Sequence, residues 1–152
     1  MAAWNEFAAA EPALAAEVSD LFTMHKHHTM ATIRRDGSPR ISGTEVNLAD
    51  GELRLGMMLG SRRAADLRAD PRLAVHSHSV DPPDDDPAAW TGEAKLSGVV
   101  VDEGSVGEGD EAADAFRVDL REVVFTQVGT PPDHLVISWW TPEWGLRRIE
   151  RR

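Results

Sequence analysis

The chain has 152 residues, enough for one domain with a single hydrophobic core. Hydrophobic residues make up 41% and charged residues 28%, which excludes global disorder and a membrane class. The formal net charge of -10 argues against nucleic acid or an acidic membrane as a partner, because both would be repelled. No apolar run approaches the roughly 18 residues needed to span a bilayer, so we expect a soluble protein. The chain has no cysteine, so disulfides and thiolate sites are excluded and the reducing cytoplasm is the expected compartment.

The N-terminal segment, residues 1–28, is predicted to contain a peripheral helix. Leu14, Val18 and Leu21 recur at helical spacing within residues 12–26, and a proline is tolerated in the first turn of a helix. Acidic residues interrupt the alanine-rich start and no basic region precedes it. We therefore do not expect a secretory signal.

Three extended segments follow, at residues 30–34, 40–48 and 52–59. They are separated by the dipeptides Asp36-Gly37 and Asp50-Gly51, which supply the positive backbone angle that hairpin turns require. These segments predict a meander of antiparallel strands.

After Gly60 the pattern changes to that of a short helix. Ser61 is a natural N-cap, and Asp70-Pro71 ends the segment. Residues 73–79 return to a strand pattern. Residues 81–89 are too rich in aspartate and proline to pack, so we expect a solvated, mobile acidic loop there.

The rest of the chain is predicted to be mainly strands. Residues 90–102 indicate a long strand whose glycines favour a bulge, and residues 110–120 indicate a second surface helix. The final strands are expected at residues 123–128, 135–141 and 146–150. About seven strands with hairpin connections predict one domain, residues 1–152, of class α+β, mainly β, built as a barrel with peripheral helices.

Two arginines occupy the first turn of the helix predicted after Gly60. Without a partner Arg62 and Arg63 are mildly unfavourable there, because the helix dipole already presents positive charge. A bound anion would make this placement favourable, since the free amides, the Ser61 hydroxyl and both guanidinium groups could form a phosphate cradle. The alternative is that both arginines are solvated or pair with Asp66 or nearby glutamates.

Histidines and tryptophans give weaker signals. His76 and His78 alternate on a predicted strand, so both could ligate a metal or lie near a haem, although structural or surface histidines are the simpler interpretation. Trp139 and Trp140 face opposite sides of a predicted strand, so that one can fill the core while the other covers a ligand or a subunit surface. No hydrolase, Rossmann or P-loop motif is present.

Several short motifs occur in a fixed order over residues 29–101, with weaker similarity at 135–151. They are Thr29-Met30-Ala31-Thr32-Ile33-Arg34, Asp36-Gly37-Ser38-Pro39-Arg40-Ile41-Ser42, Asp50-Gly51-Glu52-Leu53, Gly60-Ser61-Arg62-Arg63-Ala64-Ala65-Asp66-Leu67 and Asp70-Pro71-Arg72-Leu73-Ala74-Val75. Their order and spacing resemble the pyridoxamine 5'-phosphate oxidase-like family, which also includes deazaflavin-dependent enzymes. The resemblance implies a six-stranded antiparallel split β-barrel and a homodimer, with FMN or a deazaflavin coenzyme at the subunit interface.

The resemblance also assigns residues to the cofactor. Arg62 and Arg63 match the family's basic pair that grips the cofactor phosphate, and Ser61 opens that helix. The other matched positions would lie near the flavin ring: Arg40, Ile41 and Ser42 on one strand, Gly56 and Met57 at a strand end, and Trp140 from the partner subunit. It assigns no catalytic residue and no metal ligand.

The true oxidases bring a lysine and a tyrosine to the vitamin phosphate. This chain has no tyrosine, and Lys26 and Lys95 do not occupy that place, so oxidation of pyridoxamine phosphate is not expected. We expect a flavin-binding oxidoreductase that exchanges hydride between FMN, or a deazaflavin coenzyme, and an unidentified small organic substrate. The alternatives are a non-catalytic flavin carrier or sensor, and a haem-binding split-barrel protein that uses His76 or His78.

Overall fold

The computed structural model describes all residues, 1–152, as three α-helices, two short 3-10 turns and eight strands. The helices are α1 (Trp4–Ala10), α2 (Pro12–Met24) and α3 (Arg62–Ala69), and the 3-10 turns are η1 (Pro87–Ala89) and η2 (Gly109–Glu111). The strands are β1 (His28–Ile33), β2 (Pro39–Ala49), β3 (Glu52–Met58), β4 (Arg72–His76), β5 (Glu93–Val106), β6 (Ala113–Val128), β7 (Leu135–Thr141) and β8 (Gly145–Arg151).

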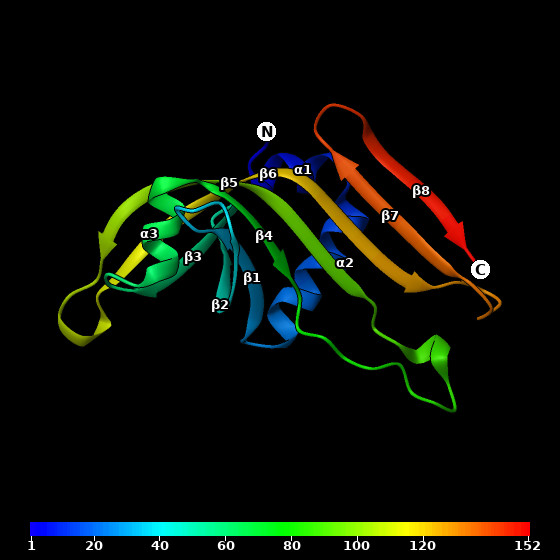
Figure 1. Ribbon diagram of the computed structural model, residues 1–152. Coiled ribbons are helices and arrows are strands. Elements are labelled where there is room, and N and C mark those ends of the chain that lie inside the picture. The colour runs from blue at the N-terminus through cyan, green and yellow to red at the C-terminus, as the bar shows by residue number, and fades with distance from the viewer.

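All eight strands belong to one antiparallel sheet in the order β3-β2-β1-β4-β5-β6-β7-β8, and β3 also pairs with β6. That additional pairing closes β1 to β6 into a six-stranded barrel, which β7 and β8 extend (Figure 1). The predicted fold class and the six-stranded barrel are therefore confirmed. None of the helices has the length and hydrophobicity needed to cross a lipid bilayer.

The helix predicted over residues 110–120 is wrong. Apart from the short turn η2, these residues belong to β6, and their buried side chains Phe116, Val118 and Leu120 follow the two-residue period of a strand. Pairing with β5 and β3 decides the conformation, because tertiary contacts override a weak local helix preference.

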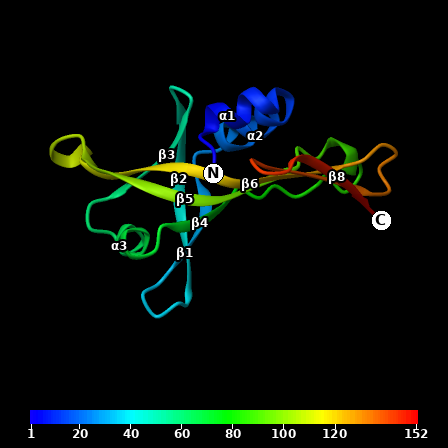
Figure 2. The same cartoon turned by 90° about the horizontal axis from the view of Figure 1, so that it is seen from above.

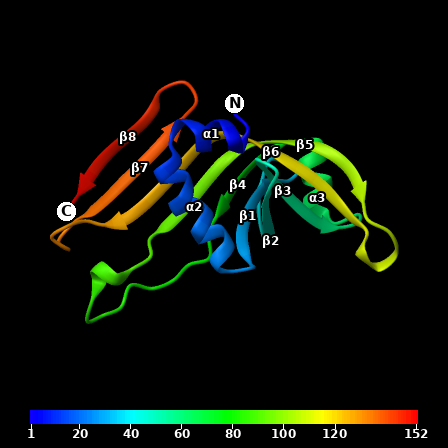
Figure 3. The ribbon, with the colours of Figure 1, turned by 180° about the vertical axis from the view of Figure 1, so that it is seen from behind.

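The N-terminal region also differs from the prediction in one respect. It contains two helices, because the first ends at Ala10 and the second begins at Pro12, a residue that lacks the N–H needed to continue the preceding helix. Both helices lie on one side of the β5–β6 pair and α3 lies on the other (Figures 2 and 3).

Along one of its edges β6 has two partners in succession, whereas β5 pairs with the other edge. Residues 113–117 pair with β3 and close the barrel, whereas residues 123–128 pair with β7. Between these halves the register shifts at Gly98 of β5, which leaves Arg121 as the extra residue of a β-bulge. A Cβ at Gly98 would lie 2.0 Å from the carbonyl oxygen of Asp119, so only glycine fits this close approach.

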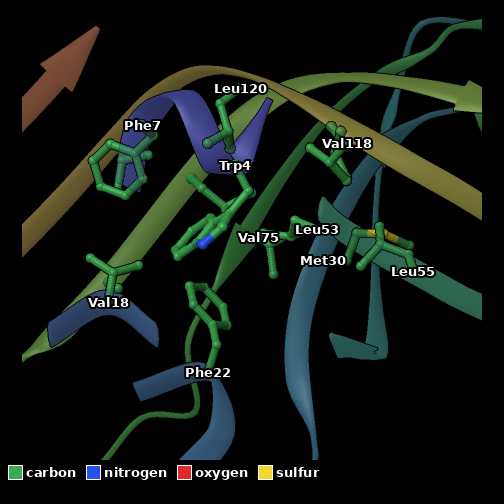
Figure 4. Packing of buried hydrophobic residues seen from close by; sticks show 14 of the residues in the cluster. Trp4, Phe7, Val18, Phe22, Met30, Leu53, Leu55, Val75, Val118 and Leu120 are labelled. Atoms are coloured by element: carbon green, nitrogen blue, oxygen red, sulfur yellow. The ribbon is translucent and has the colours of Figure 1, made fainter. Parts of the chain in front are cut away.

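The hydrophobic core runs from the barrel interior to the two N-terminal helices (Figure 4). The ring of Phe7 lies 5.2 Å from that of Trp4 and 4.9 Å from that of Trp140, so α1 covers β7. Ala64 and Leu67 of α3 join the same core, which fixes the position of that helix on the barrel. The other core residues labelled in Figure 4 are Val18, Phe22, Met30, Leu53, Leu55, Val75, Val118 and Leu120.

The bulge predicts a large cost for a small substitution. Gly98→Ala places a methyl group against a backbone oxygen, and we expect it to lower the free energy of unfolding by about 3 kcal/mol, the upper end of the usual overpacking cost. The matched control is Gly56→Ala, where nothing lies within 4 Å of the added Cβ, and which should stay within about 1 kcal/mol of the wild type. Equal effects of both variants in urea denaturation would contradict the close approach.

Candidate functional site

A groove of about 430 Å³ opens where β2 and β3 separate. Pairing between these strands extends only as far as Glu45 and Gly56, so the preceding residues 39–44 of β2 run beside β1 alone. The groove is lined by this part of β2, by the end of β3, by Arg63 of α3 and by the segment around η2.

The N-terminus of α3 lies at this groove. The Ser61 hydroxyl accepts the Ala64 N–H at 3.3 Å, which confirms the predicted cap. No group of the protein accepts the Arg62 and Arg63 amides, which belong to the first helical turn. These amides, at the positive end of the helix, are suited to bind an anion.

Arg63 is the arginine that lines the groove. Its Nε is buried and has no hydrogen-bond partner, and a buried guanidinium N–H left unpaired costs free energy. Arg62 is exposed and does not line the groove. Neither arginine pairs with Asp66, which bonds to Arg40 instead.

The Arg40 side chain forms an ion pair with α3 and does not line the groove. Its Nε donates to Asp66 Oδ2 at 2.6 Å, and the Thr32 hydroxyl donates to the same oxygen at 2.8 Å. Burial by itself raises the pKa of Asp66, but the hydrogen bonds from Arg40 and Thr32 outweigh it, so the pKa is lowered. This buried ion pair ties α3 to β1 and β2.

A second ion pair ties α3 to β6. Asp114 accepts Arg68 Nη2 at 2.9 Å through Oδ1 and the Gly60 N–H at 3.0 Å through Oδ2. The Arg68 guanidinium, followed by the Gly60 amide, lowers the pKa of the Asp114 carboxyl. The loop before α3 and the helix itself are therefore both attached to the strand that closes the barrel.

The remaining predicted residues of β2 and β3 lie at or beside the groove. Gly56 lines it, and no atom lies within 4 Å of the position a Cβ would take, so the floor is open there. Met57 also lines it, although its side chain is buried in the core. Ser42 and the exposed Ile41 immediately precede the groove residue Gly43.

The structure does not bring Trp140 to the groove. It is 4% exposed, packs against Phe7 below α1, and pairs with the second half of β6. Figure 1 shows β7 and α3 at opposite ends of the long β5–β6 pair. In this chain Trp140 is a core residue, as one of the two tryptophans of this strand was expected to be.

The predicted histidine pair does not share a strand face. β4 ends at His76, whose Nε2 lies 3.3 Å from a Glu93 oxygen, and His78 lies beyond the strand with its ring 4.2 Å from that of His25. No group of three or more His, Cys, Asp or Glu residues could hold a metal ion.

The roles of several residues at the site were not predicted from the sequence, which offered Asp66 only as a possible partner of Arg62 and Arg63. Asp66 lies between the core residues Ala64 and Leu67, and a carboxylate so placed on an amphipathic helix is a usable signal of a buried partner. Asp114 was hidden by the wrong helix prediction. Glu45 and Glu111, which also line the groove, have no local signal that separates them from solvated carboxylates.

Comparison with protein-family models and with curated proteins gives no match. Among solved structures, a pyridoxamine 5'-phosphate oxidase-related, FMN-binding protein from Nostoc punctiforme matches with a TM-score of 0.64, at 10% identity over 93% of this chain and 95% of that one. The chain is a split barrel. General Stress Protein 26 from Bacillus anthracis shares the split barrel at a TM-score of 0.57, with 12% identity over 74% of this chain and 92% of that one. A heme-binding protein from Mycobacterium smegmatis shares it at 0.50, with 15% identity over 89% and 86%.

The ion pair at Asp66 predicts a measurable contribution to the stability of the split barrel. Asp66→Asn leaves the partly buried Arg40 without its counter-charge, and we expect the free energy of unfolding to fall by about 2–3 kcal/mol. The matched control is Asp70→Asn, whose partner Arg72 is exposed, with an expected loss below about 1 kcal/mol. Denaturant unfolding of both variants at pH 7 measures the difference.

The same pair has a defined pH dependence. The pKa of Asp66 is lowered from 3.8, so its contribution is complete above pH 3.8 and is lost as pH falls through the folded-state value. The stability difference between wild type and Asp66→Asn should therefore shrink only below about pH 4. A difference that already disappears between pH 7 and pH 5 would contradict the assignment.

Proposed function

We propose that this split barrel is a flavin-binding oxidoreductase that holds FMN in the groove at α3 and exchanges hydride between the flavin and an unidentified small organic substrate. The observation that carries the proposal is the buried, unpartnered Nε of Arg63 in a groove at the N-terminus of a helix. Support comes also from the structural neighbour described as FMN-binding, which shares the fold.

A phosphate group fits this end of the groove. Arg63 supplies a cation without a protein partner, and the Arg62 and Arg63 amides supply N–H donors at the positive end of α3. The two ion pairs that anchor α3 are formed by Arg40 and Arg68, so Arg63 is not needed to hold the helix in place. Arg62, which is exposed, adds only a screened, long-range attraction.

A flat ring system fits the floor of the groove. Gly43 and Gly56 present backbone without side chains there, and the space above Gly56 is open. A bound flavin would supply the hydride chemistry, while the chain binds it, orients it and excludes water. Neither glycine can take part in proton transfer, so their role is to admit the ring.

Charge in the groove favours FMN over a deazaflavin coenzyme. Glu45, Asp110 and Glu111 line it together with Arg63. FMN carries its negative charge on one phosphate, which Arg63 can meet, whereas the side chain of the deazaflavin coenzyme adds carboxylates that these acidic residues repel. We therefore place FMN first and the deazaflavin second.

We further propose that a second copy of the chain covers the groove. Ile41 and Met58 are 76% and 77% exposed and lie beside or in it, and Leu59 follows as a third exposed apolar side chain. A cluster of exposed apolar residues beside a ligand groove is typical of an interface. A homodimer would bury this cluster and shield the cofactor from water.

The phosphate assignment predicts a selective loss of affinity. Arg63→Ala should weaken FMN binding about 10- to 150-fold, the value of one charge-assisted hydrogen bond at 1.5–3 kcal/mol, and leave riboflavin, which lacks the phosphate, unchanged. Arg62→Ala, the matched control, should have the smaller effect because that residue is exposed. Titration followed by quenching of tryptophan and flavin fluorescence measures both ligands.

Equal affinity of the wild type for FMN and riboflavin would contradict the phosphate site. Tight FMN binding with no acceleration of flavin oxidation or reduction by any candidate substrate would replace the oxidoreductase with a flavin carrier or sensor.

The dimer predicts a second selective effect. Ile41→Glu places a charge in the apolar cluster and should convert the dimer to monomer in sedimentation-velocity experiments and weaken FMN binding. Leu135→Glu, which changes an exposed leucine of β7, should do neither. A wild-type chain that sediments as a monomer would contradict the proposed second copy.

A further inference from the structure

Three histidines meet where α2 ends, β1 begins and the chain leaves β4. His28 is 4% exposed, its Nε2 lies 3.0 Å from the carbonyl oxygen of Phe22, and its Nδ1 accepts the backbone N–H of His78 at 3.0 Å. A carbonyl oxygen only accepts and an amide N–H only donates, so both contacts are satisfied by the neutral ring with its proton on Nε2. The imidazole thereby bridges the last turn of α2 and the segment after β4.

Protonation would break this bridge. A second ring proton on Nδ1 turns that atom from an acceptor into a donor, which then opposes the His78 N–H. The ring of Phe22 packs edge-on against His28, with centroids 5.0 Å apart, and gives a positive charge no counter-ion. Burial is the largest influence on the pKa of His28 and lowers it, and charge repulsion from His78 and His25 acts in the same direction. Hydrogen bonds to backbone groups of Phe22 and His25 act the other way but do not outweigh burial, so the pKa is lowered.

The charged groups around His28 do not offset this effect. His25 and His78 stack on each other from α2 and from the segment after β4. On the neighbouring strands, Glu45 of β2 pairs with Lys26, and His76 of β4 pairs with Glu93 of β5. His28 itself forms no ion pair.

We propose that His28 is a pH-sensitive latch for the cofactor groove, closed when the imidazole is neutral and open when it is protonated. His28 ends a short segment, residues 25–28, that contributes to two grooves. His27 lines the groove that Arg63 also lines, and His25 and Lys26 line an adjoining groove of about 680 Å³. The two grooves share Glu45 and Gly56, so release of this segment changes the shape of both.

The direction of the pH effect follows from the lowered pKa. Below the ordinary value of 6.5 the unfolded chain binds the proton more readily than the folded one, so the latch contributes stability above pH 6.5 and loses it as pH falls through the folded-state value. The effect on FMN affinity rests on the proposed function, whereas the opening of the latch does not.

The latch is tested on the protein without added cofactor. Nitrogen-15 NMR of the histidine rings should show His28 neutral with its proton on Nε2 at pH 7, and titrating below pH 6.5. The protection factor of the His78 amide, corrected for intrinsic exchange, should fall at least about tenfold across that titration, because an open hydrogen bond gives no protection. A ring protonated on Nδ1 at pH 7, or protection that does not follow the His28 titration, would overturn the latch.

Variants separate the latch from general acid sensitivity. His28→Gln retains a donor and an acceptor but cannot titrate, so protection at His78 should lose its pH dependence, whereas His27→Gln should keep the wild-type transition. If His28→Gln fails to fold, the double variant His25→Ala/His78→Ala answers the same question, since removal of two neighbouring imidazoles should raise the His28 titration midpoint. A midpoint that stays in place would overturn the coupling.

Binding of FMN to the wild type across the same pH range tests the connection to the groove. We expect weaker FMN binding below the His28 midpoint and a constant affinity in His28→Gln. An FMN affinity that does not change across the His28 titration would overturn the connection between the latch and the groove. Absence of FMN binding at every pH overturns the proposed function, while the NMR measurements still decide the latch.

Discussion

The split barrel depends on one edge of β6 having two partners in succession, β3 and then β7. Its first half closes the barrel against β3 and its second half carries β7, and the bulge opposite Gly98 permits the change. The same first half contains Asp114, which holds the loop and helix at the groove. The same part of β6 therefore closes the barrel and positions the N-terminal end of α3, where we propose that an anion binds.

Charge at α3 is distributed so that structure and binding use different arginines. Arg40 forms an ion pair with Asp66 and Arg68 forms one with Asp114, and both carboxylates are almost fully buried. Arg63 is left with a buried, unpartnered N–H at the groove. A rigidly held helix with one uncompensated cation is preorganised for an anionic ligand, because little reorganisation is needed when the ligand arrives. The proposed phosphate site therefore depends on Arg63 and not on Arg40, whose role is structural.

Local features of the fold could be predicted from residue patterns and the barrel from the family resemblance, whereas individual long-range contacts could not. The Ser61 cap, helix α3 and the strands joined by the two Asp-Gly turns are set by neighbouring residues, and all are confirmed. The strand at residues 113–120 depends on partners elsewhere in the chain, so local pattern favoured a helix wrongly. The structural role of Arg40 depends on its ion pair with Asp66, 26 residues away in the chain. In the same way the burial of Trp140 depends on Phe7 of α1, a helix that the sequence analysis did not separate from α2.

The most direct test of the central claim is a crystal structure of the protein with FMN. The account predicts the phosphate within hydrogen-bond distance of the Arg63 guanidinium and of the Arg62 and Arg63 amides, with the ring lying over Gly56. A phosphate held elsewhere, with Arg63 still unpartnered, would contradict it.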